Sequence, residues 1–176
     1  NKVMELEGKT VDVVWNGMTL TDEVISSMEC SNPYFNNAQV VIVPADKAEQ
    51  YQTKESLAGL VFAAENGSAG QAEVEALGNE CTPVQDQATA LLEVQSGTAD
   101  AAVIDYLMAV AMTGEGTSYA NLTHTVALNE ENYGVGFRKG SDLAEALNEF
   151  FKASYEDGTM ESIADQYGIA DSLIPQ

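Results

Sequence analysis

Basic residues are scarce in this chain of 176 residues: seven Lys and Arg stand against 28 Asp and Glu, giving a formal net charge of −21 at pH 7. Proteins bind the phosphates of nucleic acids mainly through Lys and Arg, so this balance argues strongly against a nucleic-acid partner. Arg138 is the single arginine, and it is therefore the only possible source of a bidentate ion pair with a carboxylate or phosphate. The acidic excess otherwise indicates solubility rather than a fold.

Cysteine and histidine are also scarce. Cys30 and Cys81 are too few for a disulfide framework, and they could form one bridge or remain buried thiols. No clustered His, Cys or carboxylates show the spacing of metal ligands, so no metal site is expected. The single histidine, His124, lies in an extended segment, and no G-x-S-x-G motif is present; we interpret it as structural or on the surface. No apolar run approaches the ~18 residues of a membrane span.

Hydrophobic residues, in contrast, make up 45% of the chain, which is enough for a packed core in one domain or two small lobes. Apolar runs alternate with capped, amphipathic segments, and this alternation predicts an α/β protein with mostly parallel sheets. The helices are expected to begin near Thr21, Asp86 and Ser141. A strand buried on both faces is expected at 11–15, the next strand at 39–43, and further buried strands at 60–64 and 100–104.

Small hydrogen-bonding residues follow the first predicted strand: Asn16, Gly17, Met18 and Thr19, with Thr21 beyond them. In open α/β sheets, ligands bind outside the carboxyl ends of the strands. The sequence therefore predicts one rim of a ligand site here.

A glycine-rich loop at 65–70, ENGSAG, joins another predicted strand to a helix. It lacks the Gly-Lys-Ser/Thr ending of a nucleotide-phosphate loop, so no nucleotide cofactor is expected. The backbone N–H groups of Ser68, Ala69 and Gly70 should nevertheless face an anion, and a simple helix cap is the competing interpretation.

Asp105 follows four apolar residues at the end of a predicted strand. A carboxylate there is costly unless it is paired or well hydrogen-bonded. Asp105 could cap the next helix, or it could bind the ammonium group of a ligand. Together with the two rims of hydroxyl and N–H groups, it would suit a small zwitterion.

Five blocks, in this order, resemble the extracellular polar amino-acid-binding proteins of ABC importers (solute-binding proteins, family 3): GKTVDVVWNGMTLTDE, SNPYFNNAQVVIV, AAENGSAG, SGTADAAVIDY and YGVGFRKGSDLAEALNEFFKASYEDGTMESIADQYG. They cover nearly all of the chain. The resemblance implies the type II periplasmic-binding-protein fold, with an amino acid clamped between two α/β lobes of mixed, mostly parallel sheets. It places a first lobe at 1–36 and 132–176, and a second at 38–130.

The resemblance also assigns site residues. Asn16, Gly17, Met18 and Thr19 match the ligand loop of the first lobe. Ser68 and Ala69 match the second-lobe loop that receives the ligand carboxylate, and Asp105 matches the acid that binds the α-ammonium group.

Val24 departs from the family pattern, which has a carboxylate-binding arginine three residues after Thr21. Its loss removes a charge-assisted pair. The ligand is therefore expected to lack a free α-carboxylate, to be held only by N–H donors, or to bind weakly.

Family members also carry a strand, an aromatic ligand loop, a helix and a second strand before the point where this chain begins, roughly 50–70 residues at common domain sizes. We therefore expect an incomplete first lobe with an apolar face exposed around 11–15. The exposed strand edges of such a lobe recruit partners. The chain is therefore expected to be a fragment, to pair with another chain as a dimer, or to swap segments. A removed leader is also compatible with the first residue, Asn1.

The function implied is the capture of an amino acid or related small amine-bearing solute and its delivery to the permease of an ABC importer, without covalent chemistry or a cofactor. The implied location is extracellular, as a cell-surface lipoprotein or a periplasmic protein. Two alternatives remain open. One is the ligand-binding sensory module of a receptor, and the other is a cyclic-acid dehydratase, for which Asp105 would need an acid/base partner.

Overall fold

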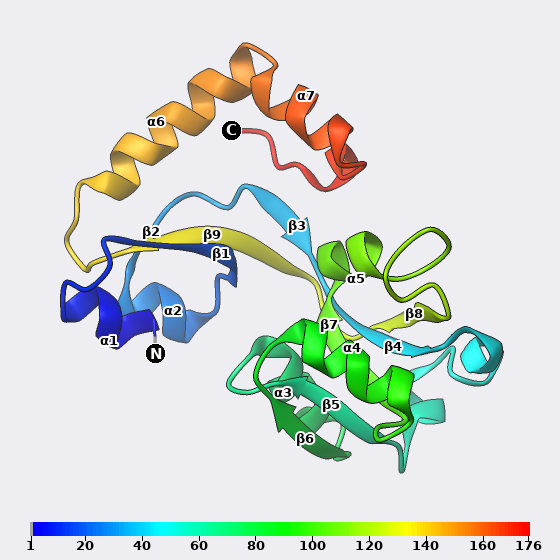
Figure 1. Ribbon diagram of the computed structural model, residues 1–176. Coiled ribbons are helices and arrows are strands. Elements are labelled where there is room, and N and C mark those ends of the chain that lie inside the picture. The colour runs from blue at the N-terminus through cyan, green and yellow to red at the C-terminus, as the bar shows by residue number, and fades with distance from the viewer. Residues whose placement is uncertain (1) are drawn as a thin grey trace. The chain divides into compact units, whose positions relative to one another are not determined.

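The computed structural model describes residues 2–176, which form two compact units (Figure 1). Unit 1 contains the described residues up to Asn37 together with Glu131–Gln176, and unit 2 contains Ala38–Glu130. The chain therefore passes between the units twice, and each unit is described by itself below.

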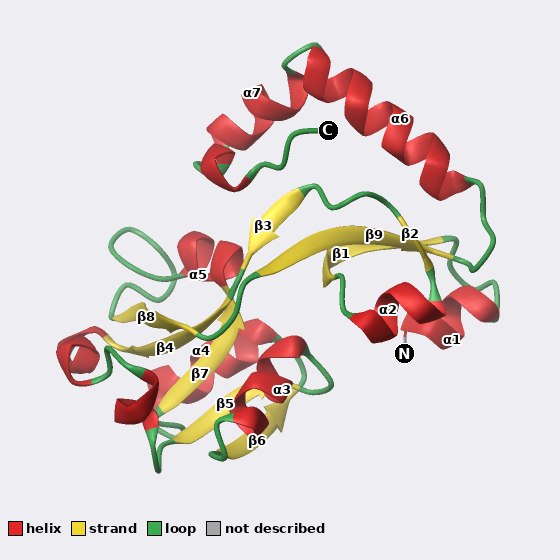
Figure 2. Cartoon of the chain, turned by 180° about the vertical axis from the view of Figure 1, so that it is seen from behind, coloured by secondary structure: helices red, strands yellow, loops and turns green. Residues whose placement is uncertain are grey.

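Unit 1 is built on a small antiparallel sheet with β9 at its centre. Strand β1 pairs with one edge of β9, and the short strands β2 and β3 pair with the other. The elements are α1 (Lys2–Glu7), β1 (Val13–Thr19), α2 (Asp22–Ser27), β2 (Glu29–Cys30), β3 (Phe35–Asn37), β9 (Glu131–Phe137), α6 (Leu143–Glu156), α7 (Thr159–Gln166) and the 3-10 turn η3 (Ala170–Ser172). Helices α1 and α2 lie on one face of this sheet, and α6 and α7 lie on the other (Figures 1 and 2).

Two glycines of β9 allow close packing on the α2 face. A Cβ at Gly134 would lie 2.7 Å from Cγ of Leu20, and a Cβ at Gly136 would lie 2.6 Å from Sδ of Met28. The side chains after β1 and α2 therefore rest directly on the β9 backbone. The core of this face is a cluster of four buried side chains: Leu6, Met18, Val24 and Met28.

The prediction of a first strand at 11–15, buried on both faces, is wrong both in position and in burial. Strand β1 starts at Val13 and lies at the edge of an antiparallel sheet, where Val13 is 42% exposed and Trp15 is 53% exposed. The apolar run instead reflects ring contacts on the α6 face. Trp15 meets the rings of Tyr34 and Phe151 edge to face, and its Nε1–H donates to Oη of Tyr34 at 3.2 Å.

Unit 2 contains a five-stranded mixed sheet in the order β6-β5-β7-β4-β8. Its elements are β4 (Gln39–Pro44), η1 (Ala45–Gln50), η2 (Lys54–Leu57), β5 (Val61–Glu65), α3 (Ala69–Ala76), β6 (Glu80–Val84), α4 (Gln87–Ser96), β7 (Ala101–Asp105), α5 (Tyr106–Met112) and β8 (Leu122–Ala127). Strand β5 is parallel to β6 and β7, whereas β4 is antiparallel to β7 and β8. An α/β fold with mixed sheets is therefore confirmed. The expectation of mostly parallel pairing is wrong, because only the β5 ladders are parallel among the described strands.

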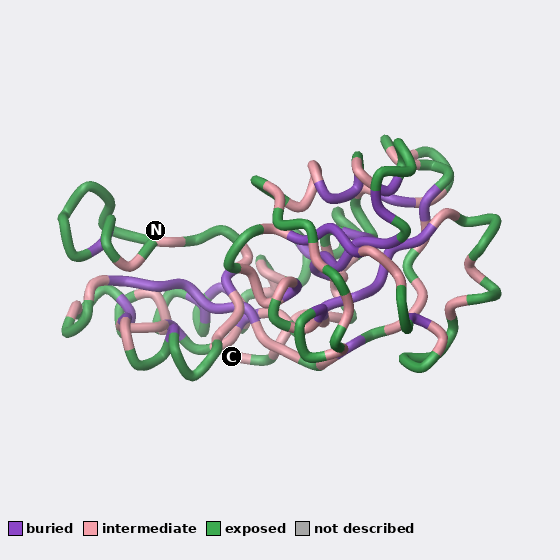
Figure 3. Tube along the Cα trace, turned by 90° about the horizontal axis from the view of Figure 1, so that it is seen from below, coloured by how far each residue is buried: buried purple, intermediate pink, exposed green. Residues whose placement is uncertain are grey.

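The three central strands of the unit 2 sheet, β5, β7 and β4, are buried on both faces, and the apolar runs at 60–64 and 100–104 predict this burial for β5 and β7. Alternate residues of β4 enter separate cores: Val40 and Ile42 pack with Leu91 of α4, and Val41 and Val43 pack with Val74 of α3. Helices α4 and α3 thus cover opposite faces. Buried residues, purple in Figure 3, include all of β7 and most of β4 in unit 2, and most of β9 in unit 1.

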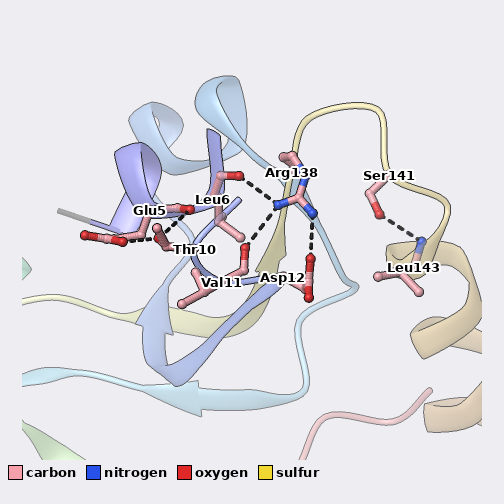
Figure 4. Close-up of polar contacts among 8 residues, drawn as sticks. All are labelled: Glu5, Leu6, Thr10, Val11, Asp12, Arg138, Ser141 and Leu143. Atoms are coloured by element: carbon pink, nitrogen blue, oxygen red, sulfur yellow. Dashed lines mark hydrogen bonds and ion pairs between the residues drawn. The ribbon is translucent and has the colours of Figure 1, made fainter. Parts of the chain in front are cut away.

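Local capping bonds fix two of the three predicted helix starts. Thr21 Oγ1 accepts a hydrogen bond from the Val24 amide, and Asp86 Oδ1 accepts one from the Thr89 amide, as expected for N-cap residues. The predicted Ser141 cap is displaced by one residue. Asp142 occupies the cap position of α6 without a side-chain bond, and the Leu143 amide donates to Ser141 Oγ at 3.3 Å (Figure 4).

Cys30, in unit 1, and Cys81, in unit 2, are both free, half-buried thiols. Burial raises the pKa of each thiol; at Cys30 the nearby Lys139 acts in the opposite direction, and at Cys81 Glu75 adds to the increase. At about pH 8 we therefore expect both to react with a disulfide reagent more slowly in the folded protein than in the denatured protein, because less thiolate is present.

The same pKa shifts determine how the stability of the folded protein changes with pH. Folding favours the protonated thiols, so this contribution is complete below the unfolded pKa of 9.0 and is lost as the pH rises through the higher folded values. Labelling over a pH series tests this, with Cys30→Ser assigning the remaining signal to Cys81. Equal labelling rates in folded and denatured protein would contradict it.

No helix among the described residues is long and apolar enough to cross a membrane.

Candidate ligand-binding site

The predicted first rim, Asn16–Thr19, lies inside β1 and not in a loop after it. Val14 is opposite Gly136 and Met18 is opposite Gly134, so β1 holds two extra residues in a bulge. Gly17 sits in this bulge with φ +70°, a conformation that favours glycine. A Cβ at Gly17 would also lie 3.4 Å from the ring of Tyr133.

The four rim residues are not equally accessible. Asn16 is exposed, and Gly17 and Thr19 are half-buried. Met18 is only 2% exposed and belongs to the unit 1 core, so its side chain is placed for packing and not for ligand contact. If Met18 contacts a ligand, as predicted, it therefore does so through its backbone alone.

Glu131, which the sequence reasoning missed, is hydrogen-bonded to this rim. Thr19 Oγ1 donates to Glu131 Oε1 at 2.9 Å, and Asn37 Nδ2 donates to the same oxygen at 2.6 Å. Glu131 opens β9 and is the register partner of Asn37 in β3. Its polar position just before the apolar run YGVGF was the available signal, but Thr19 lies 112 residues away in the chain.

Ser68, in unit 2, is the N-cap of α3, as the simple-cap interpretation predicts. Its Oγ accepts from the Gln71 amide at 3.1 Å. Its own N–H donates to the Glu65 carbonyl at 3.1 Å, and the Gly67 N–H donates to Gln71 Oε1 at 2.7 Å. The expectation that the Ser68 N–H faces an anion is therefore wrong. Ala69 begins the helix, where first-turn amides have no acceptor within a helix.

Asp105 is buried at the carboxyl end of β7, with 8% of its surface exposed. Its carboxylate does not cap α5, so that interpretation is wrong. Oδ1 instead accepts from Gln39 Nε2 at 2.6 Å, and Oδ2 accepts from Gln87 Nε2. The Asp105 N–H in turn donates to Gln87 Oε1 at 3.0 Å. Two amide side chains therefore fix the orientation of this carboxylate.

Gln39 also brings the start of α3 towards Asp105 within unit 2. A Cβ at Gly70 would lie 2.9 Å from Gln39 Oε1 and 3.0 Å from the Val103 carbonyl, so only glycine fits this contact without a shift. The sequence reasoning missed Gln39 and Gln87. A glutamine opening an otherwise apolar strand was the signal at position 39, and none was evident at position 87.

The single arginine has a structural role in unit 1. Arg138 Nη1 donates to the carbonyls of Leu6 and Val11 at 2.7 and 3.0 Å, and Nη2 pairs with Asp12 at 2.7 Å (Figure 4). Lys139 likewise donates to two carbonyls at the end of α2, at 3.0 Å each. Both cations are therefore used to tie segments of unit 1 together.

Val24, at the position where the family pattern has arginine, is 7% exposed and belongs to the unit 1 core. Its side chain packs with Met18 and Met28 under β9. The residue at this position therefore contributes to packing, and it offers no charge to a ligand.

His124 is exposed on β8, where its ring meets that of Tyr106 edge to face. The described residues contain no group of three or more His, Cys, Asp or Glu side chains placed to hold a metal ion.

A family model for bacterial extracellular solute-binding proteins, family 3, matches residues 1–170. L-cystine-binding protein TcyJ of Escherichia coli (strain K12) is 25% identical over 169 residues, covering 94% of this chain and 63% of TcyJ. The chain thus spans slightly less than two thirds of this relative.

Two solved structures are similar in fold and sequence. An ancestral amino acid-binding protein, AncCDT-1, described as a precursor of cyclohexadienyl dehydratase, aligns with a TM-score of 0.84 and 26% identity over 94% of this chain and 72% of that one. An ABC uptake transporter substrate binding protein from Streptococcus pneumoniae, with bound histidine, aligns with a TM-score of 0.78 and 29% identity over 94% and 71% of the two chains.

Proposed function

Because the chain belongs to the bacterial extracellular solute-binding proteins of family 3, we propose that it binds an amino acid or a related small amine-bearing solute for an ABC importer. The proposal fits the names of the relatives, which include an L-cystine-binding protein and a substrate binding protein of an uptake transporter.

The carboxylate of Asp105 is the observation that carries this proposal. A buried carboxylate is stable only where hydrogen bonds or a cation compensate for lost hydration. Gln39 and Gln87 supply neutral donors that fix the orientation of the carboxylate at the strand end. This arrangement favours the approach of an ammonium group.

Candidate ligand contacts are present in each unit taken by itself. Unit 1 contributes the β1 bulge with Asn16, Gly17 and Thr19. Unit 2 contributes Asp105 and the α3 start at Ser68 and Ala69, where the helix dipole favours the negative end of a zwitterion. The ligand carboxylate would there meet N–H and hydroxyl donors, as Val24 supplies no charge.

The importer permease is the proposed partner, and the proposed location is periplasmic or on the cell surface as a lipoprotein. A dimer or segment swap stays a prediction. The observation that bears on it is the exposure of Val13 and Trp15 on the edge strand β1.

A dehydratase is the second candidate function, because AncCDT-1 is described as the precursor of such an enzyme. That chemistry would need an acid/base pair. Asp105 is hydrogen-bonded to two amides, whereas His124 is exposed on β8. We therefore favour binding without catalysis.

A thermal-shift screen of amino acids and small amines tests the binding function. A ligand at about 100 times its Kd stabilises the folded state by about 2.7 kcal/mol, which raises the Tm of a chain of this size by roughly 5–10 °C. Each hit is paired with the same molecule lacking its amine, which should give no shift. If no amine-bearing compound shifts the Tm, the proposed function is wrong.

A further inference from the structure

Gln39, the first residue of β4, connects two parts of unit 2 through its side chain. It is almost fully buried, with 2% of its surface exposed. Its Nε2 donates to Oδ1 of Asp105 at 2.6 Å, and its Oε1 faces Gly70, where an added Cβ would lie 2.9 Å away. Gly70 belongs to the first turn of α3. One amide group therefore lies between the start of α3 and the carboxylate at the end of β7.

The backbone of Gln39 is held as firmly as its side chain. Its N–H donates to Oδ1 of Asn129 at 2.7 Å, and its carbonyl accepts from the Leu128 N–H at 2.8 Å. Gln39 is also the register partner of Asp105 in the β4–β7 ladder. Asn129 Nδ2 in turn donates to Oε1 of Glu73 in α3 at 3.1 Å. With its backbone fixed in this way, Gln39 responds to a displacement of α3 mainly by moving its amide.

Gly70 is the residue that permits this close contact with α3. It is buried, and a Cβ there would also lie 3.0 Å from the Val103 carbonyl. That carbonyl is part of the backbone of a central strand, whereas the Gln39 amide is the end of a side chain, so the amide yields first. When it yields, its hydrogen bond to Asp105 changes. The position of the first turn of α3 is therefore coupled to the orientation of the carboxylate.

Gln87 supports the same carboxylate in a different way. Its Nε2 donates to Oδ2 of Asp105, and its Oε1 accepts from the Asp105 N–H at 3.0 Å. Both of these bonds go to one residue, so Gln87 holds Asp105 directly against the start of α4. The link from Asp105 to α3 is provided by Gln39.

We propose that Gln39 is a positioning residue that couples the first turn of α3 to the Asp105 carboxylate, and that recognition of the ligand amine depends on this coupling. A carboxylate whose orientation is fixed in advance loses less side-chain freedom when an ammonium group binds. This inference rests on the proposed function, which requires the carboxylate of Asp105 but no particular way of holding it.

The variant Gln39→Met keeps the length of the side chain and removes the amide. The amine preference is the ratio of the affinities for an amino acid and for the same molecule without its amine. We expect Gln39→Met to lower this ratio roughly tenfold, near the upper end of the cost of ordering one side chain. Gln85→Met, at an exposed position, is the control and should leave the ratio unchanged.

Calorimetric titration measures both affinities. The probe is the amino acid that gives the largest Tm shift in the screen. For histidine, which is bound in the structure from Streptococcus pneumoniae, the analogue without the amine is imidazolepropionate.

The variant Gly70→Ala tests the coupling while keeping Gln39. The new Cβ should displace the amide and lower the amine preference by roughly threefold or more. In a Gln39→Ala background there is no amide to displace, so adding Gly70→Ala should leave the amine preference at the value of Gln39→Ala alone. Urea unfolding should show a loss of stability from the contact with the Val103 carbonyl in both backgrounds. The effect on affinity is thereby separated from the effect on folding.

An unchanged amine preference in Gln39→Met, or an equal effect of Gly70→Ala on that preference in both backgrounds, would overturn the inference while leaving the proposed function intact. Equal weakening of both probes by Gln39→Met would show a purely structural role and would also overturn it. Should Gln39→Met fail to fold, Gly70→Ala in the otherwise unchanged protein decides by the same ratio. If no amine-bearing compound binds the wild type, the proposed function is wrong, and this inference with it.

Discussion

Replacing Asp105 by Asn should weaken ligand binding by about 3 kcal/mol, or roughly a hundredfold in Kd. The carboxylate is buried and held by Gln39 and Gln87, so it is a preorganised partner for an ammonium group. Asn keeps the shape of the side chain but removes its charge. Titration calorimetry with a ligand found in the screen measures the loss.

The same substitution should lower the free energy of unfolding by about 1 kcal/mol. The new Asn NH₂ group would face the NH₂ group of Gln39 or Gln87. Gln87 cannot reverse its amide freely, because its Oε1 accepts the Asp105 N–H at 3.0 Å. Asp171→Asn, at an exposed position, is the control for both measurements. An Asp105→Asn affinity within threefold of the wild type would refute the assignment.

Replacing Gly134 by Ala should destabilise the protein by about 2 kcal/mol through overpacking. The added Cβ would lie 2.7 Å from Leu20 Cγ, which is near the base of that side chain and moves only with it. Gly136→Ala should be milder, because it meets the flexible ends of Met28 and Met18. Urea unfolding gives both values from the midpoint and slope.

The double variant Gly134→Ala with Leu20→Ala isolates this contact. Truncating Leu20 removes the clash, so the double variant should be more stable than the sum of the two single effects predicts. A strictly additive result would show that the destabilisation does not come from a clash between the new Cβ and Leu20. A Gly134→Ala protein as stable as the wild type would show that β9 tolerates a side chain on this face.

Local patterns in the sequence predicted the features that depend on nearby residues. The caps at Thr21 and Asp86 join residues three apart, and a continuous apolar run such as 100–104 is explained by burial alone. The position of Asp105 at a strand end was also readable, because it follows an uninterrupted apolar run.

Long-range pairing was not predictable in the same way. The β1 bulge forms against β9, more than 110 residues later, and only that register moves Asn16 and Gly17 into the strand. The donors to Asp105 come from 66 and 18 residues away. Single-sequence periodicity contains no information on which distant polar side chains meet, so Gln39, Gln87 and Glu131 were missed.

The central claim is that Asp105 recognises the amine of the ligand. Calorimetric titration of the wild type and of Asp105→Asn, each with an amino-acid ligand and with its deaminated analogue, tests this most directly. The wild type should prefer the amine-bearing compound by roughly a hundredfold, and Asp105→Asn should bind the two compounds almost equally. An undiminished preference in Asp105→Asn would contradict the account.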